Sequence, residues 1–147
     1  MKDADADAGR QARPDDDVLV IRLAEAESVD RGEGISTTYL VTPARGVTTF
    51  VNGITELEPG ASLPFHFHDC EESVIILSGC ASFESTEGAF ELHPGDSTLV
   101  SAGAVHRFVN PGETKLRVFF TYGSASPNRT WVDSGETAAI GSASDRP

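Results

Sequence analysis

Apolar and polar positions alternate along most of the chain in short runs, and Gly, Pro or Asn ends each run. Alternation with a period of two is typical of half-buried β-strands, and turn residues at close spacing are typical of a sandwich or barrel. No long stretch keeps the 3.6-residue period of a helix. The pattern therefore predicts an all-β fold, with strands at 18–21, 39–41, 47–51, 54–57, 73–77, 81–84, 89–92, 98–100, 106–109 and 116–122.

The two ends of the chain differ from its middle in composition. Residues 1–17 carry six Asp and few apolar side chains, which predicts a disordered acidic tail. The rest of the 147 residues fits one domain. We expect a barrel with N-terminal strands at 18–126, its core at about 48–122, and a C-terminal extension at 127–147 that frays from residue 136.

Charge and composition narrow the class of protein. The chain has 23 acidic and 11 basic residues, a net charge of -12 that repels nucleic acids and anionic membranes. No apolar run approaches the roughly 20 residues that span a bilayer, and the first residues lack the apolar segment of a secretory signal. Two cysteines are too few for a disulfide framework. These features predict a soluble, cytoplasmic protein.

Three of the four histidines, together with one glutamate, form a candidate metal site. His66 and His68 are two residues apart, so on a strand they point to the same face. Glu72 has the same even parity, and His106 on another predicted strand can complete the set. Imidazole and carboxylate ligands suit one divalent transition metal, such as Fe, Mn, Ni, Zn or Cu. The alternative is that these are surface histidines or structural histidines of the core.

Glycines frame these four residues at regular spacing. The first block is Gly60, five residues, His66, one residue, His68, three residues, Glu72, six residues and Gly79. The second block, fifteen residues later, contains Gly95, Asp96, Gly103, His106 and Asn110. The two blocks resemble the two motifs of the cupin superfamily, with Ser101 where the family has a proline. The resemblance covers about residues 48–122 and is to the small single-domain members. It implies a jelly-roll-like antiparallel β-barrel whose metal ligands are His66, His68, Glu72 and His106.

Parity also predicts the lining of a pocket. The inward face that carries His106 carries Phe108, and the last predicted strand turns Phe120 and Tyr122 to one side. We take Phe50, Asn52, Phe108 and Phe120 as candidate substrate contacts and Tyr122 as the candidate acid or base. The alternative is that they are ordinary core, because small barrels fill themselves with side chains.

Three further residues could in principle belong to the site. Cys70, inside the first block, is either a small buried residue or a reactive thiol beside the metal, and packing is the favoured interpretation. His93 and Cys80 lie outside the motifs and are expected to have no role in the site.

The resemblance implies a metal-dependent enzyme that acts on a small organic substrate, of the oxygenase (including dioxygenase), decarboxylase, lyase or isomerase type. The alternative is a non-catalytic cupin that binds or senses a small molecule. No basic helical segment precedes the barrel, which disfavours a DNA-linked sensor.

The apolar pattern of one predicted strand indicates that the protein is a homodimer. The run 74–77 is apolar on both faces, so Ile75 and Leu77 need a cover. The alternative is that residues 18–23 and Trp131 of the same chain cover them.

Overall fold

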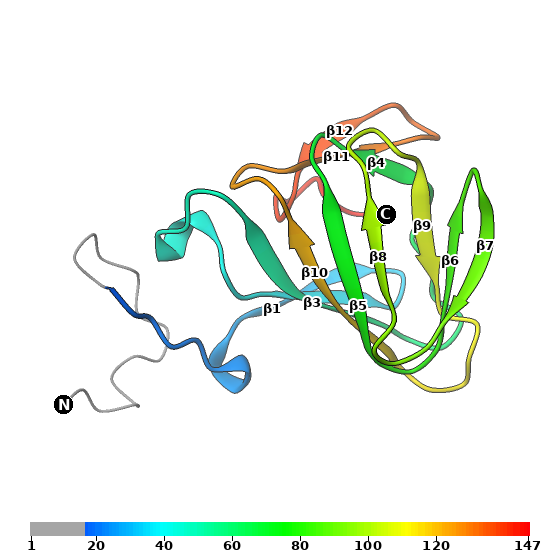
Figure 1. The fold of residues 1–147 in the computed structure, drawn as a ribbon, viewed down its shortest axis with the longest axis horizontal. Helices are drawn as coiled ribbons and strands as arrows, with labels where there is room; N and C mark the ends of the chain where they lie inside the picture. Colours follow the sequence, from blue (N-terminus) through cyan, green and yellow to red (C-terminus); the bar gives the residue numbers. More distant parts are fainter. Residues whose placement is uncertain (1–16) are drawn as a thin grey trace.

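The computed structural model describes residues 17–147, which form two six-stranded antiparallel sheets (Figure 1). The acidic tail predicted at 1–17 lies outside the described residues, apart from Asp17. The first sheet contains, in spatial order, β1 (Ser28–Gly32), β2 (Ile35–Tyr39), β3 (Val51–Leu57), β10 (Leu116–Tyr122), β5 (Glu72–Ser78) and β8 (Ser97–Val100). The second contains β12 (Thr137–Ala139), β11 (Asn128–Trp131), β4 (His66–His68), β9 (His106–Val109), β6 (Ala81–Ser85) and β7 (Gly88–Leu92).

The predicted all-β jelly-roll architecture is confirmed, as a sandwich of two sheets and not a closed barrel. Strand β10 shows how the sequence produces it. Its buried residues alternate with half-buried ones along the whole strand, as the period of two predicts. It pairs with β3 on one side and with β5 on the other, so its inward side chains lie at the centre of the core.

Gly79, which ends the first motif block, has a structural reason. Its φ is +85°, in the left-handed region that favours glycine. A Cβ at this position would lie 2.7 Å from the backbone oxygen of Lys115. The turn from β5 to β6 therefore passes close against the start of β10 only because no side chain intervenes.

The N-terminal strands lie elsewhere than predicted. The strand expected at 18–21 is wrong, because these residues pair with nothing in the described chain and Val18 is 75% exposed. The run at 47–51 is also mostly loop, following a short 3-10 helix at Pro43–Arg45. Instead the polar segments β1 and β2 form a hairpin on β3. The buried hydroxyls of Thr37 on β2 and Thr55 on β3 lie 3.0 Å apart and form a hydrogen bond with each other.

The C-terminal segment is ordered, so the prediction that it frays from residue 136 is wrong. Strand β12 pairs with β11, and the chain end then contacts β1, where the Arg146 side chain donates to the Asp30 carbonyl at 2.7 Å. Asp145 is only 2% exposed, and its carboxylate accepts a hydrogen bond from the Gly141 backbone N–H at 3.1 Å. It also pairs with two buried arginines, described below. A local sequence pattern of Gly, Ser and Ala gives no sign of these long-range pairs.

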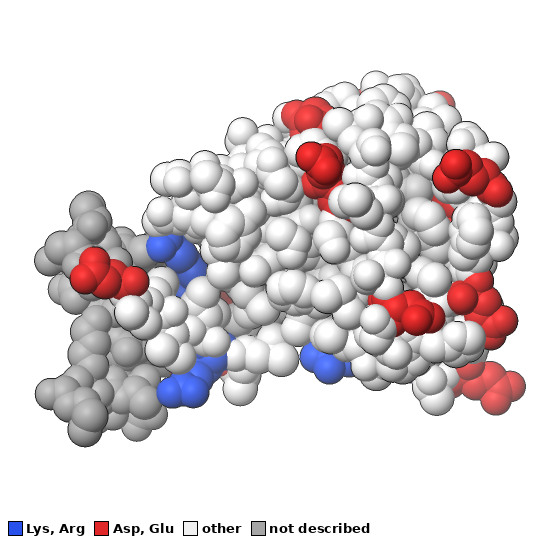
Figure 2. Space-filling model, in the orientation of Figure 1, with Lys and Arg blue, Asp and Glu red and all other residues white. Residues whose placement is uncertain are grey.

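The surface is mixed in charge. On the face shown in Figure 2, acidic side chains surround the end that carries β6 and β7, and basic ones lie toward the N-terminal end. Within residues 17–147, no helix is long and apolar enough to cross a membrane.

Candidate metal centre

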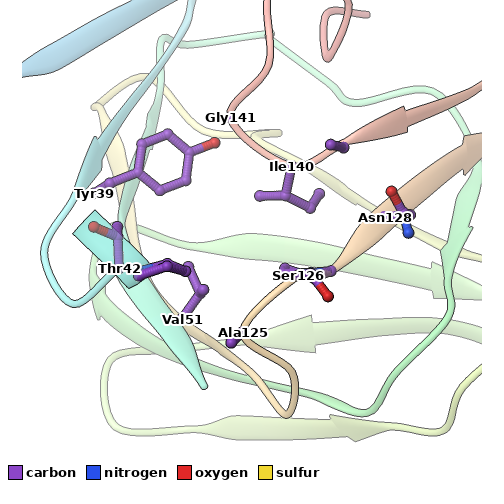
Figure 3. Close-up of a pocket in the computed structure, with 11 residues that line it drawn as sticks. Tyr39, Thr42, Val51, Ala125, Ser126, Asn128, Ile140 and Gly141 are labelled. Atoms are coloured by element: carbon purple, nitrogen blue, oxygen red, sulfur yellow. The ribbon is translucent and has the colours of Figure 1, made fainter. Parts of the chain in front are cut away.

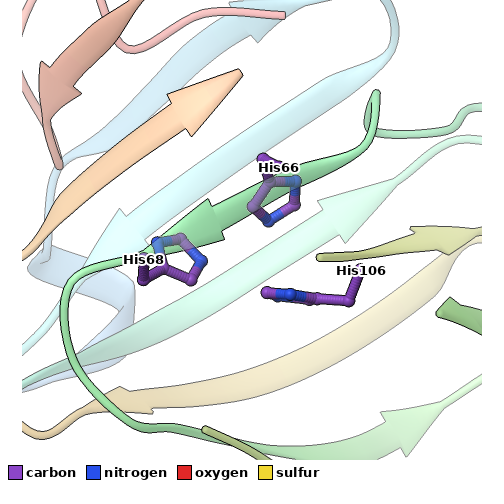
Figure 4. A group of neighbouring side chains, drawn as sticks. All are labelled: His66, His68 and His106. Atoms are coloured by element: carbon purple, nitrogen blue, oxygen red, sulfur yellow. The ribbon is translucent and has the colours of Figure 1, made fainter. Parts of the chain in front are cut away.

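The structure brings the four predicted metal ligands together between the two sheets. These residues, here called the quartet, are His66, His68, Glu72 and His106. Strand β4 supplies His66 and His68 and the adjacent β9 supplies His106, which is the register partner of His66. Their ring nitrogens lie within 4.8 Å of one another, and all three side chains are buried (Figure 4). Glu72 is the first residue of β5 in the opposite sheet, and its Oε1 lies 3.1 Å from Nε2 of His106 and 3.7 Å from Nε2 of His68.

Two local contacts hold the loops that carry these ligands. The chain turns from one sheet to the other between His68 and Glu72, and the Asp69 carboxylate fixes this turn by accepting two hydrogen bonds from Asn128, at 2.9 and 2.8 Å. The backbone N–H of Gly103 donates to the carbonyl of His68 at 2.8 Å. Gly103 has a φ of +82°, so this motif glycine lets the loop before His106 close against β4.

Each imidazole is oriented by its Nδ1 atom. The three Nδ1 atoms lie at hydrogen-bond distance from backbone carbonyls: His66 from Pro64 at 2.8 Å, His68 from Asn128 at 3.1 Å and His106 from Ala104 at 2.8 Å. A neutral imidazole that donates from Nδ1 turns the lone pair of Nε2 toward the centre, which is how metal-binding histidines are usually supported.

The Nε2 atoms fit a cation. Nε2 of His68 is buried and has no hydrogen-bond partner. Nε2 of His106 faces a carboxylate oxygen at 3.1 Å, and two lone pairs at that distance repel unless a proton or a metal ion lies with them. Three imidazoles and one carboxylate form a donor set that suits a divalent transition metal. The residues present therefore fit the metal site that the sequence predicts.

The electrostatics keep these groups in their metal-binding forms. Burial, followed by the charge of Arg129, lowers the pKa of His66 well below its usual value. Burial also lowers the pKa of His68, to about 4. Burial alone would raise the pKa of Glu72, but its contact with His106, its closeness to His68 and the positive charge of Arg129 lower it. Near neutral pH, His66 and His68 are therefore neutral and Glu72 is ionised.

A small cavity, here called the inner cavity, lies beside these side chains. Its free volume is about 30 Å³, and its lining includes His66, Glu72 and three residues predicted for the pocket or for catalysis, namely Phe108, Phe120 and Tyr122. The other two predicted residues are placed differently. Asn52 is half-buried and accepts a hydrogen bond from the backbone N–H of Val41 at 3.0 Å. Neither it nor Phe50 is among the residues that line the cavity.

Tyr122 and Arg129 form a polar pair in the wall of the inner cavity. Arg129 donates from Nη2 to the Tyr122 hydroxyl at 3.1 Å, and the Tyr122 ring lies 4.8 Å from that of His68. Burial, with the charge of Glu72, raises the pKa of Tyr122 well above its usual value. The phenol therefore keeps its proton at neutral pH. Sequence reasoning did not find Arg129, because it lies in the segment interpreted as an extension.

A larger pocket, here called the outer pocket, is lined by other side chains than the four candidate ligands (Figure 3). It has a volume of about 520 Å³ and is mostly apolar, between Tyr39, Val51 and the segment around Ile140. Asn128 also lines it, and the carbonyl of this residue is the one that orients His68. The sequence analysis did not predict this pocket, because it assigned Tyr39 and Val51 to separate strands and residues 127–147 to a C-terminal extension.

The cysteines stand apart from the quartet. Cys70 is buried in the core, where burial and the charges of Asp69 and Glu72 raise its pKa to about 11, so it is a thiol near neutral pH. Packing therefore accounts for it. Cys80 lies with Glu91 and His93 in a second group whose ligand atoms are within 4.8 Å of one another. That group is largely on the surface, with the His93 side chain 60% exposed.

Comparison with known proteins agrees with the geometry. The Cupin domain model matches residues 53–122, the segment that contains all four candidate ligands. Residues 53–122 form a cupin domain. The cupin resemblance predicted from the two glycine-framed blocks is therefore confirmed.

Individual relatives are distant. The cupin is 29% identical over 112 residues to the protein SchB of Streptomyces halstedii, an alignment that covers 74% of this chain and 81% of SchB. It is 31% identical over 84 residues to a germin-like protein of Morus alba, covering 53% of this chain but only 40% of that protein's length. Among solved structures, it superposes on the polyketide cyclase RemF of Streptomyces resistomycificus with a TM-score of 0.68 and 18% identity, over 87% of this chain and 89% of RemF. A likeness at that identity shows the shared fold.

Proposed function

We propose that this cupin is a metal-dependent enzyme that acts on a small organic substrate. The observation that carries the proposal is the buried cluster of His66, His68, His106 and Glu72. Each Nδ1 lies at hydrogen-bond distance from a backbone carbonyl, and one ring nitrogen of each histidine lies within 4.8 Å of the others. When bound there, a divalent transition metal (Fe, Mn, Ni, Zn or Cu) supplies a Lewis acid that polarises a carbonyl or enolate oxygen, or a site for O2 chemistry.

The chain's own residues contribute orientation and a proton. The backbone carbonyls fix the imidazole rings, so the ligand geometry needs little reorganisation. Tyr122, protonated and held by Arg129, lines the inner cavity together with Glu72 and can donate a proton to a developing oxyanion there. Phe108 and Phe120 give this space an apolar wall. The reaction type that fits best is an oxygenase, lyase or isomerase reaction.

The test is turnover after metal exchange. The protein, stripped with a chelator and reloaded in turn with each metal, is incubated with a panel of small acids and ketones, and products are followed by mass spectrometry. Turnover with one or two metals that is lost in Tyr122→Phe and in His106→Ala supports the proposal. Saturable binding of panel compounds without turnover under any metal contradicts it and supports a non-catalytic binding cupin.

A further inference from the structure

Two buried arginines share the inner cavity with the metal ligands. Arg31 comes from β1 in the first sheet and Arg129 from β11 in the second, and both side chains line the cavity with His66 and Glu72. Arg31 is 5% exposed and Arg129 is 3% exposed. Burying a guanidinium is costly unless its charge and its N–H groups find partners.

The two guanidinium groups have too few hydrogen-bond partners for all of their N–H donors. The Asp145 carboxylate pairs with Arg129, and its Oδ1 lies 3.6 Å from Nη2 of Arg31. Arg31 Nη2 and Arg129 Nε are nevertheless buried with no hydrogen-bond partner. One carboxylate is thus shared by two cations, and their mutual repulsion contributes, after burial, to a lowered pKa of Arg31.

The charge of the site points to an anion. The guanidinium groups of Arg31 and Arg129 carry two positive charges, which the carboxylates of Asp145 and Glu72 balance. A divalent metal on the quartet adds two positive charges that no described side chain lining the inner cavity offsets. An anionic group in this space would restore the balance and also accept the free N–H donors.

The space limits the size of that group. The inner cavity has about 30 Å³ of free volume, and one water molecule needs about 10–15 Å³ of such space. Room for about two or three water molecules matches the three heavy atoms of a carboxylate. Guanidinium groups bind carboxylates through parallel N–H donors, which makes arginine suited to this role.

We propose that the inner cavity binds the carboxylate of a small organic acid, which accepts hydrogen bonds from Arg31 and Arg129. This assignment rests on the proposed function, since it names the substrate class of the same site. It gives the two arginines a binding role beyond holding the C-terminal segment through Asp145.

Acetate and acetamide are the matched probes, since they have the same shape and differ in charge. Binding is followed by the fluorescence of Trp131, the chain's single tryptophan, whose ring lies 5.5 Å from His66 and 5.2 Å from the Arg129 guanidinium. We expect acetate to change the fluorescence saturably and acetamide to do so at least about tenfold more weakly. Equal affinity for the two probes, or no acetate binding, overturns the proposal.

Substitutions separate a binding role from a structural one. Arg31→Gln should weaken acetate binding at least about tenfold. Arg31→Lys keeps the positive charge but has a single side-chain nitrogen, so it should give an intermediate affinity. Asp145→Asn should tighten acetate binding, because it removes the carboxylate that competes for the positive charge of the two guanidinium groups. If the arginines serve only to hold Asp145, the folded Asp145→Asn protein gains no affinity and the Arg31 variants lose none, and the proposal is wrong.

Metal analysis of the same samples distinguishes this proposal from the proposed function. A metal-loaded protein that does not distinguish acetate from acetamide contradicts the carboxylate site and leaves the metal enzyme standing. A protein that takes up no metal but still prefers acetate contradicts the enzyme and leaves the carboxylate site standing, because the N–H donors belong to the chain itself.

Discussion

Asn110, the last residue of the second motif block, should be one of the most sensitive positions in the fold. It is fully buried between β9, which carries His106, and β10, which carries Tyr122. Its Nδ2 donates to the carbonyls of Leu57 at 3.0 Å and Thr114 at 2.9 Å, and its Oδ1 accepts from the Gly112 N–H at 3.0 Å. Asn110→Ala removes all three hydrogen bonds.

At about 1 kcal/mol for each hydrogen bond, the loss is about 3 kcal/mol of unfolding free energy. For a chain of this size that corresponds to a fall in Tm of about 6–12 °C. The matched control is Asn52→Ala, which removes one part-buried hydrogen bond to Val41 and should cost about 1 kcal/mol. Calorimetry of both variants measures the difference. Equal falls in Tm for Asn110→Ala and Asn52→Ala would refute the reasoning that the buried network holds the two strands.

Three further predictions follow from the same structure. In chelator-treated protein, the free energy of unfolding should fall by about 3 kcal/mol as the pH drops from about 6.5 to about 4. The reason is that His68 takes up a proton in the unfolded chain, whereas the folded imidazole, with a pKa of about 4, stays neutral over this range. Thermal melts between about pH 7.5 and 4 measure it, and an unchanged pH slope in His68→Gln would contradict it. Tyr122→Phe should leave metal content unchanged, as measured by elemental analysis, because the hydroxyl contacts Arg129 and no metal ligand; loss of the metal would contradict this. We also propose that the protein is a homodimer through the exposed Ile75 and Leu77, so light scattering should give about twice 15.6 kDa, falling to the monomer mass in Ile75→Asp; a concentration-independent mass of 15.6 kDa for the unmodified chain would rule it out.

The intramolecular alternative to that dimer does not match the structure. Trp131 is buried beside His66 and not over β5, and both Ile75 and Leu77 remain exposed in the described chain. Residues 18–23, expected to cover them in a monomer, are themselves mostly exposed.

The parts of the fold that could be predicted from sequence are those governed by short-range geometry. A strand's period of two determines which side chains share a face. The buried side chains of β10, and the common face of His66 and His68 on β4, follow directly from this period. The motif glycines at 79 and 103 mark positive φ angles where other residues are strained.

The parts that could not be predicted depend on partners far away in the chain. Arg31 and Asp145 are separated by 114 positions, and nothing near either residue signals that both will be buried. The run at 18–21 shows the converse, since residues with high β-propensity form no strand when no neighbour supplies a ladder. The arginines of the inner cavity and the outer pocket were missed for the same reason.

Elemental analysis of the purified protein and three variants tests the central claim most directly. His66→Ala and His106→Ala remove candidate ligands, and His93→Ala is the matched control, because it removes an exposed histidine of the separate surface group. We predict about one equivalent of a divalent transition metal in the unmodified protein and in His93→Ala, and much less in the other two variants, with circular dichroism confirming that each is folded. Metal content equal to that of the unmodified protein in both His66→Ala and His106→Ala would contradict the metal centre.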